Sequence, residues 1–258
     1  MPRFSANLGF LWPDRPLLER IDAAGAAGFR AVELHWPQDV APDAVRARCA
    51  AQGLRLLGIN TPPGRTELGE FGLGALPGRE SEFLDGFSVT LDWARRAGAG
   101  AIHVMAGVVP PGARDAARAT LIDNLRRAAG MAPEMTLLLE GINQTDRPGY
   151  FYSTLEAKAG VLAETGAANV RILFDAYHVG LSEGDVLGRL ERYLPLVGHV
   201  QIAAVPSRAE PDEGEVDYRH VFDTLDRLGY AGWVGCEYRP RAGTDPGLDW
   251  VRTLGVTL

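Results

Sequence analysis

The sequence predicts an α/β protein, a single (β/α)8 or TIM barrel that forms one catalytic domain over residues 1–258. The length of 258 residues is close to the ~250 that is typical of this fold. Strand-like and helical segments alternate along the whole chain, which favours a parallel sheet with helical crossovers. Four apolar runs in the second half end on oxygen-bearing side chains that are 35, 26 and 36 residues apart. Each interval fits one strand, one helix and two loops.

The composition excludes several classes of protein. The net charge is −7 and no basic run is present, which argues against a nucleic-acid partner. No stretch approaches the ~20 apolar residues of a membrane span, so we expect a cytoplasmic protein without a membrane partner. Cys49 and Cys236 lack CxxC spacing and are interpreted as reduced packing residues. A homo-oligomer remains open.

The first half of the chain supplies four predicted strands and four predicted helices. Pro42 suits the first turn of the second helix, while Gly28 and Gly53 follow the first and second helices as stop signals. The predicted strands are residues 4–7, 31–34, 55–60 and 101–105, and the predicted helices are residues 17–27, 42–52, 79–97 and 115–129.

Residues 61–78 differ from their neighbours because they are rich in glycine and proline and have little apolar periodicity. We expect a long loop there. Such loops are often lids or binding loops, and a solvated excursion is the alternative.

An open sheet would require a glycine-rich turn after the first strand, and residues 7–12 contain no GxGxxG. A closed barrel is therefore preferred.

The second half repeats the same unit four times. The predicted strands end at Glu140, Asp175, Gln201 and Glu237. The predicted helices are residues 154–164, 185–193, 218–228 and 248–254.

These four strand-end residues form the main candidate site. In α/β barrels the carboxyl ends of the strands meet at the face that carries the chemistry. Oxygen ligands suit Mg²⁺ or Mn²⁺, and such a site can also take Zn²⁺ or Co²⁺. The sequence therefore predicts a divalent metal ion bound by Glu140, Asp175, Gln201 and Glu237.

Two further residues are candidates for substrate binding. His178 follows Asp175 by three residues, where a loop could return its imidazole to the barrel mouth, although a loop-capping role is an alternative. Arg208 follows Gln201 closely and could clamp a substrate carboxylate in a bidentate fork, or form a surface salt bridge.

The remaining histidines and one asparagine receive different predictions. His103 and His35 lie near the ends of the fourth and second strands, where each could contact substrate or be structural. Asn60 ends the third strand and is also a candidate substrate contact. His199 shares the inward face of Gln201 but lies lower in the barrel, so we expect a supporting role in the core. His220, within a helix, is expected at the surface.

Several segments resemble the hydroxypyruvate isomerase family of xylose-isomerase-like barrels. They are Arg-Phe-Ser-Ala-Asn-Leu at 3–8, Leu-Pro-Gly-Arg-Glu at 76–80, Leu-Glu-Gly-Ile-Asn at 139–143, Asp-Ala-Tyr-His at 175–178 and Trp-Val-Gly-Cys-Glu-Tyr at 233–238. Residues 210–218 and 237–244 are similar to the related 2-oxo-tetronate isomerases. Gly141 departs from the Glu-Pro-Ile-Asn of many members, and the loop at Gly64 lacks their Gly-Asp-Trp.

The resemblance implies that Glu140 and Glu237 are the catalytic acid and base, and that the same two residues surround a divalent metal together with Asp175 and Gln201. The expected reaction moves a carbonyl between adjacent carbons of a small hydroxy-keto acid through an enediolate, as from hydroxypyruvate to tartronate semialdehyde. A ketose 3-epimerase of the same superfamily is the main alternative, since it uses a similar pair of carboxylates. A metal-dependent endonuclease and a non-catalytic sugar-acid binding protein also remain as alternatives.

Overall fold

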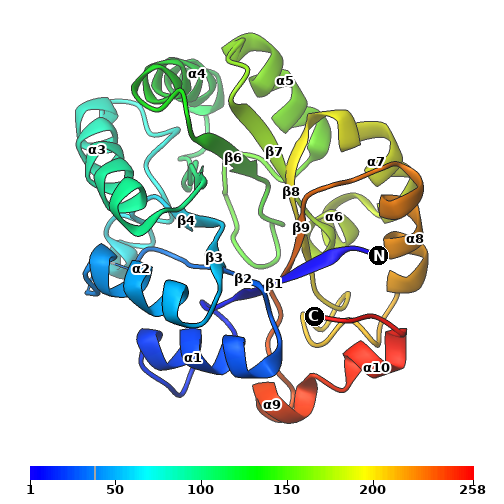
Figure 1. Ribbon diagram of the computed structural model, residues 1–258. Helices are drawn as coiled ribbons and strands as arrows, with labels where there is room; N and C mark the ends of the chain where they lie inside the picture. Colours follow the sequence, from blue (N-terminus) through cyan, green and yellow to red (C-terminus); the bar gives the residue numbers. More distant parts are fainter. Residues whose placement is uncertain (38) are drawn as a thin grey trace.

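The computed structural model describes residues 1–37 and 39–258 and shows a barrel of parallel strands surrounded by helices (Figure 1). The strands are β1 (Arg3–Asn7), β2 (Ala31–Glu33), β3 (Arg55–Leu56), β4 (Gly58–Asn60), β5 (Ala101–His103), β6 (Thr136–Glu140), β7 (Val170–Asp175), β8 (Val197–Ile202) and β9 (Trp233–Cys236). Their order in the sheet is β3-β2-β1-β9-β8-β7-β6-β5-β4, and every pair is parallel. The predicted fold class is confirmed.

The third predicted strand is divided into β3 and β4 at Leu57. β3 pairs with β2 and β4 pairs with β5, so this one segment closes the sheet. Backbone hydrogen bonds from Leu57 N to Val32 O (2.9 Å) and from Leu34 N to Gly58 O (3.1 Å) join its two halves to β2.

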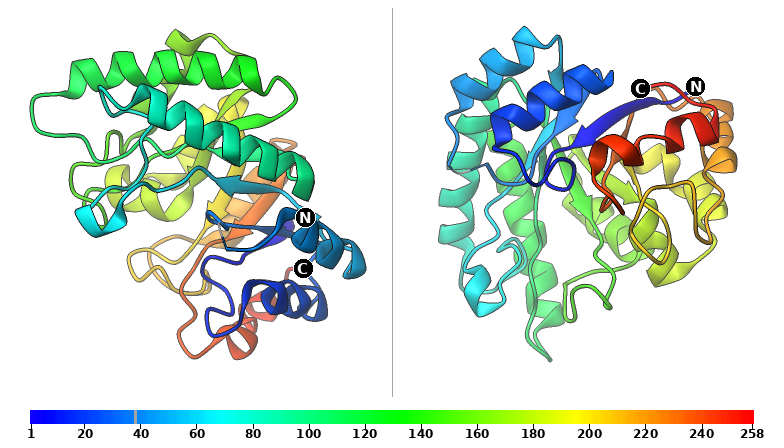
Figure 2. Two further views of the ribbon diagram at one scale, coloured as in Figure 1. Left: turned by 90° about the vertical axis from the view of Figure 1, so that its left-hand side faces the viewer. Right: turned by 90° about the horizontal axis from the view of Figure 1, so that it is seen from below.

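The helices form an outer ring around the sheet (Figure 2). Apolar side chains fill the layer between the ring and the strands, as a doubly covered parallel sheet requires. The helices are α1 (Leu17–Ala27), α2 (Pro42–Ala51), α3 (Glu80–Ala97), α4 (Arg114–Met131), α5 (Leu155–Thr165), α6 (Ala176–Glu183), α7 (Val186–Tyr193), α8 (Tyr218–Arg227), α9 (Thr244–Gly247) and α10 (Trp250–Leu254), with 3₁₀ turns η1 (Thr66–Leu68) and η2 (Leu194–Leu196). In the described part of the chain, none is long and apolar enough to cross a membrane.

The prediction of a loop after Asp175 is wrong, because helix α6 begins at the next residue. Asp175 caps this helix, since its Oδ1 accepts a hydrogen bond from Tyr177 N at 2.8 Å. Strand β7 and helix α6 meet without a connecting loop. The sequence at this junction therefore contains no glycine or proline that would mark a turn. His178 is consequently held on a helical turn.

The segment after β4 follows the predicted loop, with only a short 3₁₀ turn, η1, inside it. Glu70 holds its two ends together through ion pairs with Arg65 (2.8 Å) and Arg79 (2.9 Å). Gly72 forms a backbone bridge with Ala106, and a Cβ at Gly72 would lie 2.4 Å from Met105 O. Only glycine fits this close approach, which anchors the loop against the barrel rim.

The C-terminal helix seals the junction between the first and last strands. Trp250 is fully buried, its ring lies 5.4 Å from that of Phe4, and its indole N–H donates to Tyr238 Oη at 3.0 Å. Phe4 also packs edge-to-face on Phe222, at 5.2 Å. Removing a buried aromatic side chain of this size typically costs about 3–5 kcal/mol. The closed barrel therefore depends on residues from both ends of the chain.

Candidate active site

The structure brings the four strand-end residues together at the carboxyl face of the barrel. Glu140 is the last residue of β6, Asp175 the last of β7, Gln201 lies near the end of β8, and Glu237 directly follows β9. Each is 6 % exposed or less. Charged side chains are this deeply buried only where they are paired or bind a ligand.

A cavity of about 850 Å³, here called the mouth cavity, is lined by two of these residues, Glu140 and Glu237. The loop after β4 forms one wall through residues 62–64, Thr66, Glu67 and Phe71. The other walls include Phe10, His35, His103, Glu140, His178, Arg208 and Glu237. A ligand in this cavity would therefore lie beside both glutamates, three histidines and Arg208.

Each of the four strand-end residues has one buried oxygen that lacks a hydrogen-bond partner within the described residues. These atoms are Glu140 Oε1, Asp175 Oδ2, Gln201 Oε1 and Glu237 Oε2. Buried oxygens of this kind are costly unless they are satisfied by a partner that protein atoms do not supply. Four oxygens, three of them from carboxylates, suit a hard divalent cation. The donor set thus fits the predicted metal.

Glu140 lies between two imidazoles. Its Oε2 is 3.5 Å from His103 Nδ1, and its Oε1 is 3.7 Å from His178 Nε2. Burial, together with the neighbouring carboxylates of Glu237 and Asp175, raises the pKa of Glu140 well above its usual value. Burial also raises the pKa of Asp175. Desolvation raises both pKa values, and neighbouring negative charge adds to the shift of Glu140. A bound cation would favour the ionised form of both carboxylates.

His103 and His178 are neutral at physiological pH. Burial lowers the pKa of each to about 3, and the charge of Arg208 contributes for His178. Neutral imidazoles can exchange hydrogen bonds with a bound substrate without adding charge to the site.

Glu237 is flanked by His35 and Arg208. Its Oε1 lies 3.4 Å from His35 Nε2 and 3.6 Å from Arg208 Nη2. Arg208 also approaches Asp175 (4.0 Å) and Asp146 (3.4 Å). The alternative of a surface salt bridge does not hold, because Arg208 is largely buried and lines the mouth cavity.

The position of Arg208 is fixed from several sides. Its guanidinium lies between two aromatic rings, 4.7 Å from the centroid of Phe10 and 4.8 Å from that of Tyr177. Its backbone has φ 56°, which is unfavourable for a residue with a Cβ, and it is held by hydrogen bonds to Ala204 O (2.8 Å) and from Arg239 N (2.7 Å). These contacts hold the positively charged guanidinium of Arg208 beside Glu237.

Asn143 determines the tautomer of His178. Its backbone N–H (3.3 Å) and its side-chain amide (2.7 Å) both point at His178 Nδ1, and its Oδ1 accepts from Asp146 N at 2.8 Å. Nδ1 must therefore accept, which places the proton on Nε2. A group of ligand atoms from Glu140, Asp175 and His178 lies within 4.8 Å. Because Nε2 carries the proton, it cannot bind a cation, and we interpret His178 as a hydrogen-bond donor to substrate. Gln201 is then the fourth oxygen ligand of the metal.

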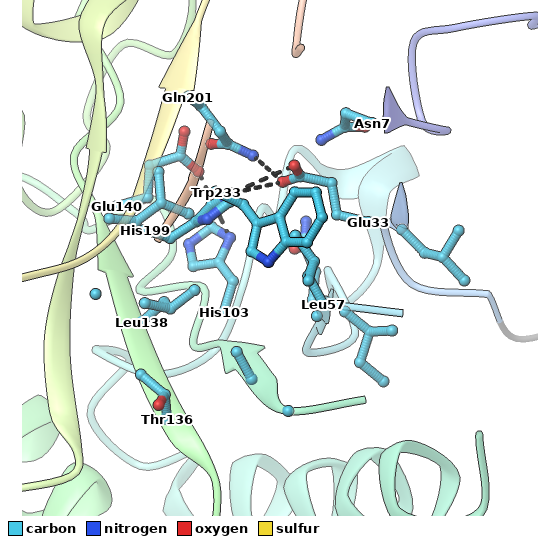
Figure 3. Close-up of a pocket in the computed structure, with 18 of the residues that line it drawn as sticks. Asn7, Glu33, Leu57, His103, Thr136, Leu138, Glu140, His199, Gln201 and Trp233 are labelled. Carbon is cyan, nitrogen blue, oxygen red and sulfur yellow. Dashed lines mark hydrogen bonds and ion pairs between the residues drawn. The ribbon is translucent and has the colours of Figure 1, made fainter. Parts of the chain in front are cut away.

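Glu33 is a buried member of the site that the sequence interpretation missed. It ends β2 and accepts hydrogen bonds from Ser5 Oγ (2.7 Å), Gln201 Nε2 (2.7 Å) and His199 Nε2 (3.1 Å). His199 thus has the predicted supporting position. Figure 3 shows Glu33 beside Gln201 and His199 in a second pocket, with His103 and Glu140 on its other wall. This pocket, here called the lower chamber, has a volume of about 180 Å³. The sequence did contain a signal for Glu33, because this charged residue directly follows the apolar residues Ala31 and Val32 of strand β2.

The other predicted residues divide between the site and the surface. His103, His35 and Asn60 line the mouth cavity, whereas His220 lies exposed on α8 beside Asp217. Arg147 and Arg239 also line the cavity and were not predicted. Arg147 occupies a loop that no motif singled out, and Arg239 lies in the 237–244 segment, whose resemblance to other isomerases did not assign it a role.

Comparison with known proteins supports an α/β-barrel enzyme of the predicted class. Residues 21–254 match the family described as xylose isomerase-like TIM barrel. The 2-oxo-tetronate isomerase of Cupriavidus necator is 47% identical over 255 residues, covering 98% of each chain. A putative hydroxypyruvate isomerase of Mus musculus is 44% identical over 262 residues, covering 97% of this chain and 94% of that protein.

The crystal structure of a protein from Brucella melitensis, named AP endonuclease, family 2, superposes with a TM-score of 0.95 at 39% identity. The superposition covers 98% of this chain and 99% of that one.

The chain belongs to the xylose isomerase-like TIM barrel family. Its curated relatives at 44–47% identity are named isomerases, and the resemblance to hydroxypyruvate and 2-oxo-tetronate isomerases is confirmed. The expectation of an enzyme of this type is likewise confirmed.

Proposed function

We propose that this protein is a metal-dependent isomerase that moves a carbonyl between adjacent carbons of a small hydroxy-keto acid. The observation that carries the proposal is the set of four buried strand-end oxygens that have no hydrogen-bond partner among the described residues. Two of them belong to Glu140 and Glu237, which line the mouth cavity. Isomerases of two such acids are among the relatives that cover nearly the whole chain.

The reaction requires two proton transfers at carbon. One glutamate takes a proton from the hydroxyl-bearing carbon, which gives an enediolate, and the other returns a proton to the former carbonyl carbon. The hydroxyl proton moves between the two oxygens, so the conversion involves no net oxidation. A positioned acid or base contributes about 10²–10⁴-fold. Glu140 and Glu237 come from β6 and from the end of β9, so they approach a bound substrate from different strands.

The neighbouring residues have supporting roles in this mechanism. Asp175 and Gln201 would hold the divalent ion together with the two glutamates, and the ion would act as a Lewis acid that stabilises negative charge developing on the substrate. His178 donates from Nε2, and Arg208, beside Glu237, polarises a substrate oxygen. His103 and Asn60 contact substrate from the cavity wall.

The substrate carboxylate has two candidate partners other than Arg208, whose charge is already shared by three carboxylates. The Arg147 guanidinium stacks on Phe71 at 4.2 Å, and that of Arg239 lies 6.0 Å from the Phe10 ring. Within residues 1–37 and 39–258, neither forms an ion pair with a carboxylate. We assign these two arginines to the substrate carboxylate.

The cavity has room for an acid of four carbons as well as for one of three. Its volume of about 850 Å³ lies in the range of pockets that hold ligands much larger than hydroxypyruvate. The relative with 47% identity is named for a 2-oxo-tetronate. The preferred substrate class is thus a 2-oxo-tetronate, with hydroxypyruvate as the shorter alternative.

A substrate panel in D₂O tests the proposal. Hydroxypyruvate, 2-oxo-tetronates and free ketoses are incubated with and without Mn²⁺ or Mg²⁺, and products are identified by NMR. The proposal requires a shifted carbonyl and deuterium at the new C–H. Inversion of one centre with the carbonyl unmoved would show an epimerase, while binding without turnover would show a sugar-acid binding protein.

An oligonucleotide with an abasic site is included in the panel because the similar Brucella melitensis protein is named an AP endonuclease. The net charge of −7 opposes DNA binding, so no strand cleavage is expected. Metal-dependent cleavage without turnover of any acid would replace the isomerase proposal.

A further inference from the structure

We propose that Glu33 is a positioning residue that fixes the amide of Gln201 so that its oxygen, and not its nitrogen, faces the metal. This inference rests on the proposed metal site. The observation behind it is the 2.7 Å hydrogen bond from Gln201 Nε2 to Glu33 Oε2, which leaves Gln201 Oε1 buried and, among the described residues, unpartnered on the other side (Figure 3).

The orientation matters because the two ends of an amide have opposite chemistry. The oxygen can bind a cation, whereas the NH₂ group donates hydrogen bonds and cannot. A flipped Gln201 would place its oxygen at the 2.7 Å contact with a carboxylate oxygen of Glu33 and would turn its nitrogen toward the cation. Both contacts would be repulsive, so Glu33 selects one of two otherwise similar orientations.

Glu33 can perform this role because every side-chain group hydrogen-bonded to it can donate. Besides Gln201 Nε2, Ser5 Oγ (2.7 Å) and His199 Nε2 (3.1 Å) donate hydrogen bonds to Glu33. The carboxylate therefore acts as an acceptor toward all three side chains. It is buried at 6 % exposure. Among the described residues, Glu33 is the only carboxylate that lines the lower chamber and is not itself a proposed ligand.

The neighbouring strand makes room for the carboxylate. A Cβ built on Gly235 of β9 would lie 2.1 Å from Glu33 Oε1 and 2.9 Å from Gln201 Cγ. Any larger residue at this position would therefore displace the Glu33–Gln201 pair. The absence of a side chain at Gly235 is a requirement of this arrangement.

Mn²⁺ binding, measured by the loss of the free-ion EPR signal, tests the inference without an activity assay. Glu33→Gln keeps the size of the side chain but allows it to donate, so Gln201 can turn. Substitution of a residue that supports a metal ligand typically lowers affinity about 10–100-fold, and we expect a loss in this range. Thermal unfolding and circular dichroism check that the variant is folded.

A double-mutant cycle separates orientation from charge. In a Gln201→Ala background there is no amide to orient, so adding Glu33→Gln should change Mn²⁺ affinity by less than about twofold. An equal loss in both backgrounds would show that Glu33 acts only through its negative charge and would overturn the inference.

Ser5→Ala provides a second variant in case Glu33→Gln does not fold. It removes one hydrogen bond to Glu33 without altering charge or touching Gln201, and an affinity loss of about threefold is expected. Unchanged affinity in Ser5→Ala and Glu33→Gln, with Mn²⁺ bound by the unmodified protein, would contradict this inference alone. Absence of Mn²⁺ binding by the unmodified protein would instead contradict the metal site itself, and the inference with it.

Discussion

Arg208 and Glu237 face each other at the barrel mouth, with Nη2 of the arginine 3.6 Å from Oε1 of the glutamate. The guanidinium is held between the rings of Phe10 and Tyr177, so its position does not depend on Glu237 alone. The site therefore presents a fixed cation beside a residue proposed to transfer protons.

Replacing Arg208 by lysine should lower kcat while leaving the fold intact. An ammonium group cannot reproduce the planar stacking between two rings or the fork of donors. Loss of one positioned donor of this kind costs about 10²-fold in kcat. Steady-state kinetics measure the effect, and Arg227→Lys, which alters an exposed ion pair with Glu191, is the matched control. An unchanged kcat would remove Arg208 from the mechanism.

Glu140→Gln and Glu237→Gln should each abolish turnover. An amide cannot accept and return a proton at carbon, and the expected loss is about 10²–10⁴-fold or more. Glu156→Gln, on the exposed face of α5, should retain full activity. Turnover in D₂O and circular dichroism distinguish lost chemistry from lost structure, and normal activity in either variant would refute the two-glutamate assignment.

Removal of metal should abolish activity, and Mn²⁺ or Mg²⁺ should restore it. Without a cation, the buried oxygens of Glu140, Asp175 and Gln201 have no hydrogen-bond partner among the described residues. They would then oppose the negative charge that develops on the substrate. Asp175→Asn should also weaken Mn²⁺ binding by at least about tenfold, whereas the exposed Asp223→Asn should not. Full activity after rigorous chelation would reject the metal but not the glutamate chemistry.

Arg147→Met and Arg239→Met should raise KM for acidic substrates. Each variant removes a cation from the cavity wall while keeping an apolar stem, and loss of one charge-assisted contact predicts about a tenfold increase. Arg192→Met is a suitable control, because Arg192 also stacks on an aromatic ring, Tyr193, but lies exposed on α7. A change in kcat alone, with KM unaltered, would contradict the assignment to the carboxylate.

Lys158 should make stability depend on pH in the alkaline range. Its amine is buried, donates to Leu173 O at 3.1 Å, and has a pKa lowered by burial to about 8. In the unfolded chain the group stays protonated to about pH 10.4. Between these values the unfolded state binds more protons, so the free energy of unfolding rises with pH, by at most about 3 kcal/mol.

Lys158→Met should remove this gain. Urea unfolding of both proteins in EDTA, from pH 7 to pH 10, measures the difference in the free energy of unfolding. A difference that stays constant across this range would show that Lys158 does not titrate there.

The sequence alone determined the barrel and the position of its chemistry. Alternation of strand and helix predicted the fold, and helix α1 matches its predicted bounds. The four apolar runs ending on oxygen-bearing residues located Glu140, Asp175, Gln201 and Glu237, because parallel strands place their ends on one face whatever lies between them. This pattern is local, so it can be seen without knowing the tertiary structure.

The tertiary structure alone decided how these residues are oriented and charged. The pairing of Glu33 with Gln201 joins side chains 168 residues apart, and the contact of Arg208 with Phe10 links elements at opposite ends of the chain. Glu33 ends an apolar strand like the other four, yet β2 is so short that its last residue is not distinctive. Which amide atom faces the site, which imidazole nitrogen holds a proton and which arginine is available to a substrate depend on distances of a few ångströms. These distances arise only when distant strands close into one barrel.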